Sequence, residues 1–230
     1  MRQRLRDERG FTLIEIIVGM ASGTVILGAT FMLVQIAIRS QVDASTRVAS
    51  IQQGRAAVND LTRSVRAQTC LGDGSAAFIS ATDTSMQFYT SVGAAQTDYQ
   101  RVQRRTISWV ADPTGDMGRI TEVTEQGTGR PPNVTGWSAP VTRVLASDVK
   151  LIPSTPFLRY YTFQGNPASA TLQLPTPVSA GNRFRIIKVE FSFQASTDRA
   201  NQANPELRFI NSATARTADP DAQEGTLPCN

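Results

Sequence analysis

The chain has 230 residues, of which 23 are Lys or Arg, 19 are Asp or Glu and none is His. Without imidazole, Ser-His-Asp and Cys-His nucleophile arrangements, HExxH metalloenzymes and most zinc or iron sites are excluded. The length, with 40% hydrophobic and 18% charged residues, predicts a folded chain of one domain with an appendage, or of two small domains. The arginines beyond the first ten residues are scattered, which argues against a nucleic-acid partner.

An arginine-rich leader, residues 1–10, precedes a long apolar segment. Over residues 11–38 the only ionisable side chain is Glu15. This length suffices for a helix that crosses a membrane, which needs about 20 residues. A secretory signal peptide cut near residues 21–23 is the weaker alternative, because its apolar region would be only about 7–15 residues long. The basic leader predicts a cytoplasmic N-terminus and an exported head.

Glu15 stands at the edge of the apolar segment, where a carboxylate is costly and therefore suggests a function. The sequence RGFTLIE of residues 9–15 resembles the processing site of type IV prepilins and type II secretion pseudopilins. The resemblance implies that a prepilin peptidase in the membrane cuts between Gly10 and Phe11. It also implies that this peptidase methylates the new amino group of Phe11.

Glu15 lies one helical turn beyond Phe11, so its carboxylate could neutralise that amine or the amine of a staggered neighbouring subunit. The alternative is that Glu15 only reaches the lipid headgroups. Gly19 and Gly23 form a Gly-x-x-x-Gly pair that predicts close helix packing in lipid, although this spacing is common by chance. By the resemblance, the partners are other pilins or pseudopilins, met through the helix, and an inner-membrane assembly platform.

Beyond Arg39 the apolar and small residues continue at helical spacing. Because no proline precedes Pro113, we predict one helix over residues 11–65. Its transmembrane half is residues 11–38, and its amphipathic half, residues 39–68, is expected to pack on a sheet. Two helices broken near Ser40 or Gly54 are the alternative. The predicted stripe is Val42, Ser45, Val48 or Ala49, Ile51, Gly54, Val58, Leu61 and Val65.

From Thr69 onward, Gly, Ser, Thr, Asn and Pro become frequent and short alternating or β-branched runs appear. This pattern predicts an antiparallel β-rich head over residues 69–230. The fold class is therefore α+β, and by the resemblance pilin-like, with a long helix packed on the sheet. In the last long run, Phe184, Ile186 and Val189 are expected on one face. Candidate strands are 76–80, 85–90, 104–110, 119–123, 141–145, 157–163, 183–192 and 206–210.

Two cysteines flank the predicted head. Cys70 lies where the helix should end and Cys229 is the penultimate residue, and in an exported head both are free to oxidise. A bridge closing about 160 residues would stabilise the fold by about 5 kcal/mol in the chain-entropy model. We predict this disulfide over two unpaired thiols. The acidic residues Asp219, Asp221 and Glu224 match no EF-hand spacing, so a solvated tail is expected rather than a calcium site.

Residues 59–66, 149–152 and 157–161 resemble the W-type minor pilins and J-type pseudopilins, whose heads are larger than those of major pilins. The sequence thus predicts a minor pilin or pseudopilin that helps to initiate or cap a type IV pilus or a type II secretion pseudopilus. It would be a single-pass protein of the inner membrane and later part of the fibre, with no cofactor or catalytic residue.

The sequence leaves two alternative functions. The first is a binding module on the fibre, for a surface, DNA or a secreted substrate, which Trp109, Trp137, Tyr160 and Tyr161 permit without requiring it. The second is a membrane-anchored exported enzyme. No nucleophile–base pair, metal cluster or phosphate loop in the sequence supports an enzyme, and an enzyme leaves the RGFTLIE motif unexplained.

Overall fold

The computed structural model describes residues 12–92, 101–113, 117–164, 170–195 and 207–215. The chain divides into two compact units, Met1–Arg47 and Val48–Asn230. Helix α1, Leu13–Arg66, runs unbroken from the first unit into the second. One continuous helix is therefore confirmed, and the break considered near Ser40 or Gly54 does not occur. Arg63 and Arg66 lie in its last turn, where cations interact favourably with the helix dipole.

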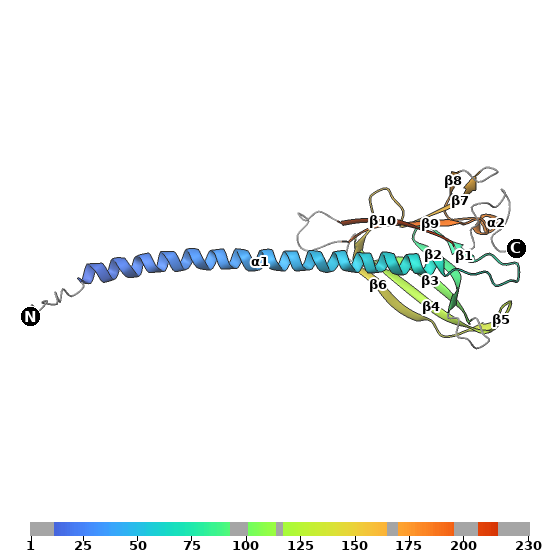
Figure 1. Ribbon diagram of the computed structural model, residues 1–230, viewed down its shortest axis with the longest axis horizontal. Coiled ribbons are helices and arrows are strands. Elements are labelled where there is room, and N and C mark those ends of the chain that lie inside the picture. Colours follow the sequence, from blue (N-terminus) through green and yellow to red (C-terminus); the bar gives the residue numbers. More distant parts are fainter. Residues whose placement is uncertain (1–11, 93–100, 114–116, 165–169, 196–206, 216–230) are drawn as a thin grey trace, which may run out of the picture. The chain divides into compact units, whose positions relative to one another are not determined.

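The second unit is built around a ten-stranded sheet in which every described pairing is antiparallel. The strand order is β1-β2-β3-β4-β6-β9-β7-β8, while β10 pairs with β9 and β5 pairs with β4 (Figure 1). The fold class is α+β, with a long apolar N-terminal helix and a large antiparallel sheet. The strands are β1 Phe78–Ala81, β2 Ser85–Val92, β3 Arg101–Ala111, β4 Gly118–Arg130, β5 Asn133–Trp137, β6 Val141–Lys150, β7 Leu158–Gln164, β8 Ala170–Leu174, β9 Lys188–Ala195 and β10 Leu207–Thr214; the short helix α2 is Ala180–Arg183.

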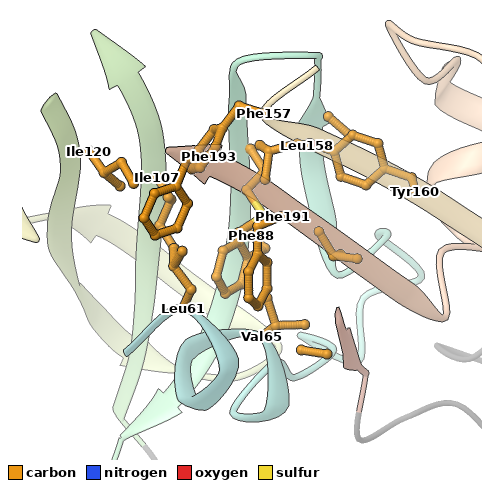
Figure 2. Close-up of a cluster of buried hydrophobic side chains, with 14 of the residues drawn as sticks. Leu61, Val65, Phe88, Ile107, Ile120, Phe157, Leu158, Tyr160, Phe191 and Phe193 are labelled. Carbon is orange, nitrogen blue, oxygen red and sulfur yellow. The ribbon is translucent and has the colours of Figure 1, made fainter. Parts of the chain in front are cut away.

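The last three turns of α1 supply one wall of the hydrophobic core. Leu61 and Val65 are fully buried, and Figure 2 shows them directed into the cluster that holds Phe88 and Phe191. These long-range contacts join the helix to β2 and β9, which are far apart in the sequence. Burial of large apolar side chains is the main favourable contribution to folding, about 1.5–3 kcal/mol for each.

Tyr160 of β7 is the largest fully buried side chain. Its hydroxyl donates a hydrogen bond to the carbonyl oxygen of Thr82 at 3.0 Å, and its ring meets Phe78 edge to face. Burial raises the pKa of this phenol, because the charged form would lose its hydration. Tyr160 is thus a satisfied core residue that ties β7 to the β1–β2 turn.

The predicted helix stripe is correct only in its C-terminal part. Val42 and Val48 stay more than half exposed, whereas burial begins at Gly54. Ala57 and Ser64, which the stripe did not include, are buried as well. Small side chains are buried here because they let the helix approach the sheet closely.

The predicted strand 183–192 is wrong in its first half. Arg183 ends α2, Phe184 caps it, and β9 begins only at Lys188. Both Ile186 and Ile187 are buried, which a strand with one solvent face would not allow. Strands β5 and β8 were not predicted at all. Each has only five residues, and β5 contains Gly136. The alternation of apolar and polar residues in β8 is present in the sequence but short.

Candidate membrane span and assembly site

The N-terminal part of α1 exposes apolar side chains on all of its sides. By length and composition this helix could span a membrane. Leu13 is 78% exposed and Met32 69%, values expected of surface polar residues rather than of aliphatic ones. The other large apolar side chains exposed here are Ile14, Ile16, Ile17, Val18, Met20, Val25, Ile26, Leu27, Phe31, Leu33, Val34, Ile36 and Ile38.

The hydroxyl groups within this apolar stretch are satisfied inside the helix. Ser22 donates to the carbonyl oxygen of Val18, and Thr30 donates to that of Ile26 at 2.8 Å. Thr24 reaches back in the same way to Met20 at 3.0 Å. In a hydrocarbon environment an unpaired hydroxyl is costly, and bonding to the preceding turn removes that cost. These three hydroxyl groups are therefore compatible with lipid.

Thr12 and Glu15 form a reciprocal cap at the start of α1. The amide and hydroxyl of Thr12 point to Glu15 Oε2 at 3.4 and 3.5 Å, and the amide of Glu15 points to Thr12 Oγ1 at 3.4 Å. Since α1 begins at Leu13, these are the N-cap and third helical positions of a capping box. The Thr-x-x-Glu spacing of this cap is visible in the sequence.

Gly10 and Phe11 lie outside the described residues, so cleavage between them and pairing of the Phe11 amine with Glu15 stay predictions. Gly19 and Gly23 are described, and a Cβ added at either one would meet nothing within 4 Å. Both glycines therefore leave open surface on α1, and their packing against another helix also stays a prediction.

A cluster of charged side chains around one buried carboxylate joins the other end of α1 to the sheet. We call Asp60, Ser64, Arg105, Glu122 and Arg143 the helix–sheet cluster. Glu122 of β4 is only 4% exposed. It accepts hydrogen bonds from Arg105 of β3 and Arg143 of β6, both at 2.9 Å, and from Ser64 of α1 at 3.3 Å. Three strands and the helix thus meet at one carboxylate.

Arg143 extends the cluster to a second residue of the helix. Its Nη2 lies 2.9 Å from Glu122 and 3.1 Å from the carboxylate of Asp60. Arg105 also donates to Ser64 at 3.2 Å. The two carboxylates and two guanidinium groups balance in charge, which makes burial of Glu122 tolerable. This cluster was not predicted, because its members are separated by up to 83 positions and share no motif.

The aromatic residues considered for ligand binding do not form one site. Tyr160 is fully buried, and Trp109 packs against the core while its indole donates to the carbonyl oxygen of Val149 at 3.2 Å. These two residues are structural. Tyr161 lies under the ammonium group of Lys188, 4.1 Å from the ring centre.

Trp137 belongs to a separate stack on β5. Its ring lies against Tyr89, with centroids 5.8 Å apart, and Arg104 lies 4.8 Å from its centre. Arg104 also forms a bidentate salt bridge with Glu125, in which Nε and Nη2 each lie 2.7 Å from a carboxylate oxygen. These hydrogen bonds lower the pKa of Glu125. The guanidinium group of Arg104 is therefore fixed by Glu125 and Trp137.

Cys70 follows the helix closely, as predicted, and in the structure it is not a free thiol. Cys229 lies outside the described residues, as do Asp219, Asp221 and Glu224. The pairing of Cys70 with Cys229 therefore stays a prediction. Within the described ranges, no group of His, Cys, Asp and Glu side chains is arranged to hold a metal ion.

No protein-family model, curated protein sequence or solved structure matches this chain.

Proposed function

We propose that this chain is a minor pilin or pseudopilin, a subunit that helps to initiate or cap a type IV pilus or a type II secretion pseudopilus. One observation carries the proposal. A single 54-residue helix is exposed and apolar at its N-terminal end and buried against an antiparallel sheet at its C-terminal end, and the RGFTLIE sequence stands at its start. A plain membrane anchor explains the apolar stretch but neither this motif nor the buried end.

In this proposal each part of the chain has a distinct task. The apolar helix holds the subunit in the inner membrane, with the leader on the cytoplasmic side and the head exported. A prepilin peptidase removes residues 1–10, which leaves a positive amine on Phe11. Glu15 offers the carboxylate for that amine or for the amine of a neighbouring subunit, since an unpaired charge is costly in a helix bundle within lipid. The platform and other pilins then draw the helix into a fibre.

Glu15 would exchange one partner for another during this process. In the uncut chain its carboxylate caps Thr12 through contacts of 3.4–3.5 Å, which are long for charge-assisted hydrogen bonds. A cationic amine created one residue before Thr12 is a stronger partner than a neutral amide. The capping contacts therefore hold the carboxylate near the place where the amine appears, and they are weak enough to be replaced.

The test is the mass of the N-terminus. Protein isolated from the membranes of a host with a working prepilin peptidase should have lost residues 1–10 and carry one methyl group on Phe11. Gly10→Val should remain uncut, whereas Gly28→Val, a change of the same size within the apolar helix, should be processed normally. An N-terminus at Met1 in such a host would refute the proposal.

A further inference from the structure

The solvent-facing side of α1 in the second unit carries positive charge. The side that packs on the sheet consists of the buried residues Gly54, Ala57, Leu61, Ser64 and Val65. Exposed polar residues recur between them every three or four positions and therefore share the opposite side of the helix. We call this side the arginine face, and its residues are Gln52, Arg55, Asn59, Arg63 and Arg66.

The three arginines of this face have no counter-charge in the described part of the chain. Asp60, the acidic residue nearest to them in the helix, pairs with Arg143 instead. The guanidinium groups of Arg55, Arg63 and Arg66 form no hydrogen bond or ion pair with another described residue. Arg63 and Arg66 lie three positions apart, where like charges repel. The helix dipole favours arginine in the last turn of α1, but Arg55 lies about three turns earlier.

The spacing of the arginines indicates the shape of a complementary partner. From Arg55, Arg63 lies about 12 Å and Arg66 about 17 Å along the helix, and all three fall within about 80° around its axis. An extended strand advances about 3.3 Å per residue, so it covers 17 Å in about five residues. Because five is odd, a carboxylate placed opposite Arg66 would then point away from one placed opposite Arg55. A second helix has the same rise as α1 and can match all three positions on one face.

We propose that the arginine face is a docking site for a helix of a different protein, which carries acidic side chains about eight and eleven positions apart on one face. Its carboxylates would pair with Arg55, Arg63 and Arg66. Charge complementarity of this kind selects the partner and fixes its register. The inference does not use the proposed function, because it rests only on contacts within the second unit.

A second copy of α1 is a poorer partner. The acidic residues of α1 are Glu15, Asp43 and Asp60, and no two of them are eight or eleven positions apart. Anionic lipid is also a poorer partner, because Arg55 lies about 25 Å along the helix beyond Ile38, where the apolar stretch ends. The charge and spacing of the arginine face therefore favour a helix from another protein.

The test uses photo-crosslinking in the full chain, expressed in its own host and kept in the membrane. A photoreactive amino acid replaces Gln52 in one variant and Asn59 in a second, and the crosslinked peptides are sequenced by mass spectrometry. We expect both probes to capture one acidic helix of another protein, with the crosslinked position displaced by about seven residues between them. An extended partner would give a displacement of about three residues, because each of its residues spans about twice the distance.

Charge reversal provides the matched control. Arg55→Glu combined with Arg63→Glu should lower the crosslink yield about tenfold or more. Arg119→Glu combined with Arg185→Glu, which changes two exposed arginines elsewhere on the unit, should leave the yield unchanged. Replacing the captured carboxylates of the partner by arginine should restore the yield of the Arg55→Glu, Arg63→Glu protein, which a misfolded variant could not show.

Several outcomes would overturn the proposal. These are crosslinks only to a second copy, to lipid or to nucleic acid, a displacement of about three residues, a yield that charge reversal leaves unchanged or that charge exchange does not restore, and no crosslinks at all. None of them depends on cleavage after Gly10, which is measured separately by the N-terminal mass.

Discussion

Gly54 of α1 lies directly beneath the aromatic ring of Phe209 on β10. A Cβ built on Gly54 would overlap the end of this ring. The ring has little freedom to move away, because it stacks on Phe193 with centroids 5.3 Å apart. The sequence suggested Gly54 as a possible break in the helix, whereas in the structure it is a point where helix and sheet approach closely.

Gly54→Ala should therefore destabilise the protein, although Gly→Ala within a helix normally stabilises by about 1 kcal/mol. The added methyl group must displace the Phe209 ring, and overpacking of this kind costs about 1–3 kcal/mol. Denaturant unfolding of the full chain in detergent measures the difference. Gly28→Ala is the control, because a Cβ there meets nothing within 4 Å. Equal or greater stability of Gly54→Ala would show that the ring moves aside freely.

The extent of α1 could be predicted because the signals for a helix are local. No proline occurs before Pro113, and the apolar spacing continues to Val65. Most strands could be located for the same reason, since β-branched runs alternate with turn residues. The prediction failed at Ile186 and Ile187, where two adjacent buried side chains looked like strand but follow a turn of helix.

The polar contacts of the second unit could not be predicted, because they join distant parts of the chain. Nothing in the sequence around Glu122 indicates that Ser64 and Arg143 surround it. The Thr12–Glu15 cap, in contrast, joins residues only three positions apart. Its spacing is a known signature of a helix start and is predictable from the sequence.

Two substitutions at Glu15 distinguish its role as a helix cap from its role as a negative charge. Glu15→Gln keeps a side-chain oxygen that can accept from Thr12 but removes the negative charge, whereas Glu15→Leu removes both. We expect both variants to be cleaved and held in the membrane at normal levels, because Gly10 and the apolar helix are unchanged. Both should fail to restore fibres in a deletion strain, since the Phe11 amine loses its counter-charge. Fibres formed with Glu15→Gln would show that the carboxylate serves only the cap.

Loss of the Glu122 carboxylate should strongly destabilise the second unit. Glu122→Leu leaves Arg105, whose side chain is 22% exposed, without its anion, whereas the more exposed Arg143 keeps Asp60. Loss of hydrogen bonds to a charged group of this kind costs about 1.5–3 kcal/mol. Glu125→Leu is the matched change in a more exposed pair, and it should cost about 1 kcal/mol or less. Denaturant unfolding compares the two variants directly. Similar losses for both would mean that burial does not set the strength of these pairs.

The predicted bridge between Cys70 and Cys229 can be tested on a gel. The full chain should migrate differently with and without reducing agent, and Cys70→Ser should abolish the difference. Reduction should also lower the melting temperature, because removal of a disulfide from an exported domain costs about 2–5 kcal/mol. Alkylation of both thiols without prior reduction would contradict the pairing.

The position of Glu122 has a mechanical consequence. Its strand, β4, is hydrogen-bonded to β3 along one edge and to β6 along the other. Part of a pull on α1 passes through Asp60 and Ser64 to Arg143 and Glu122, and so reaches an interior strand of the sheet. The load is then shared by two rows of backbone hydrogen bonds instead of peeling away an outer strand one bond at a time. At this contact the sheet therefore resists displacement of the helix through two neighbouring strands at once.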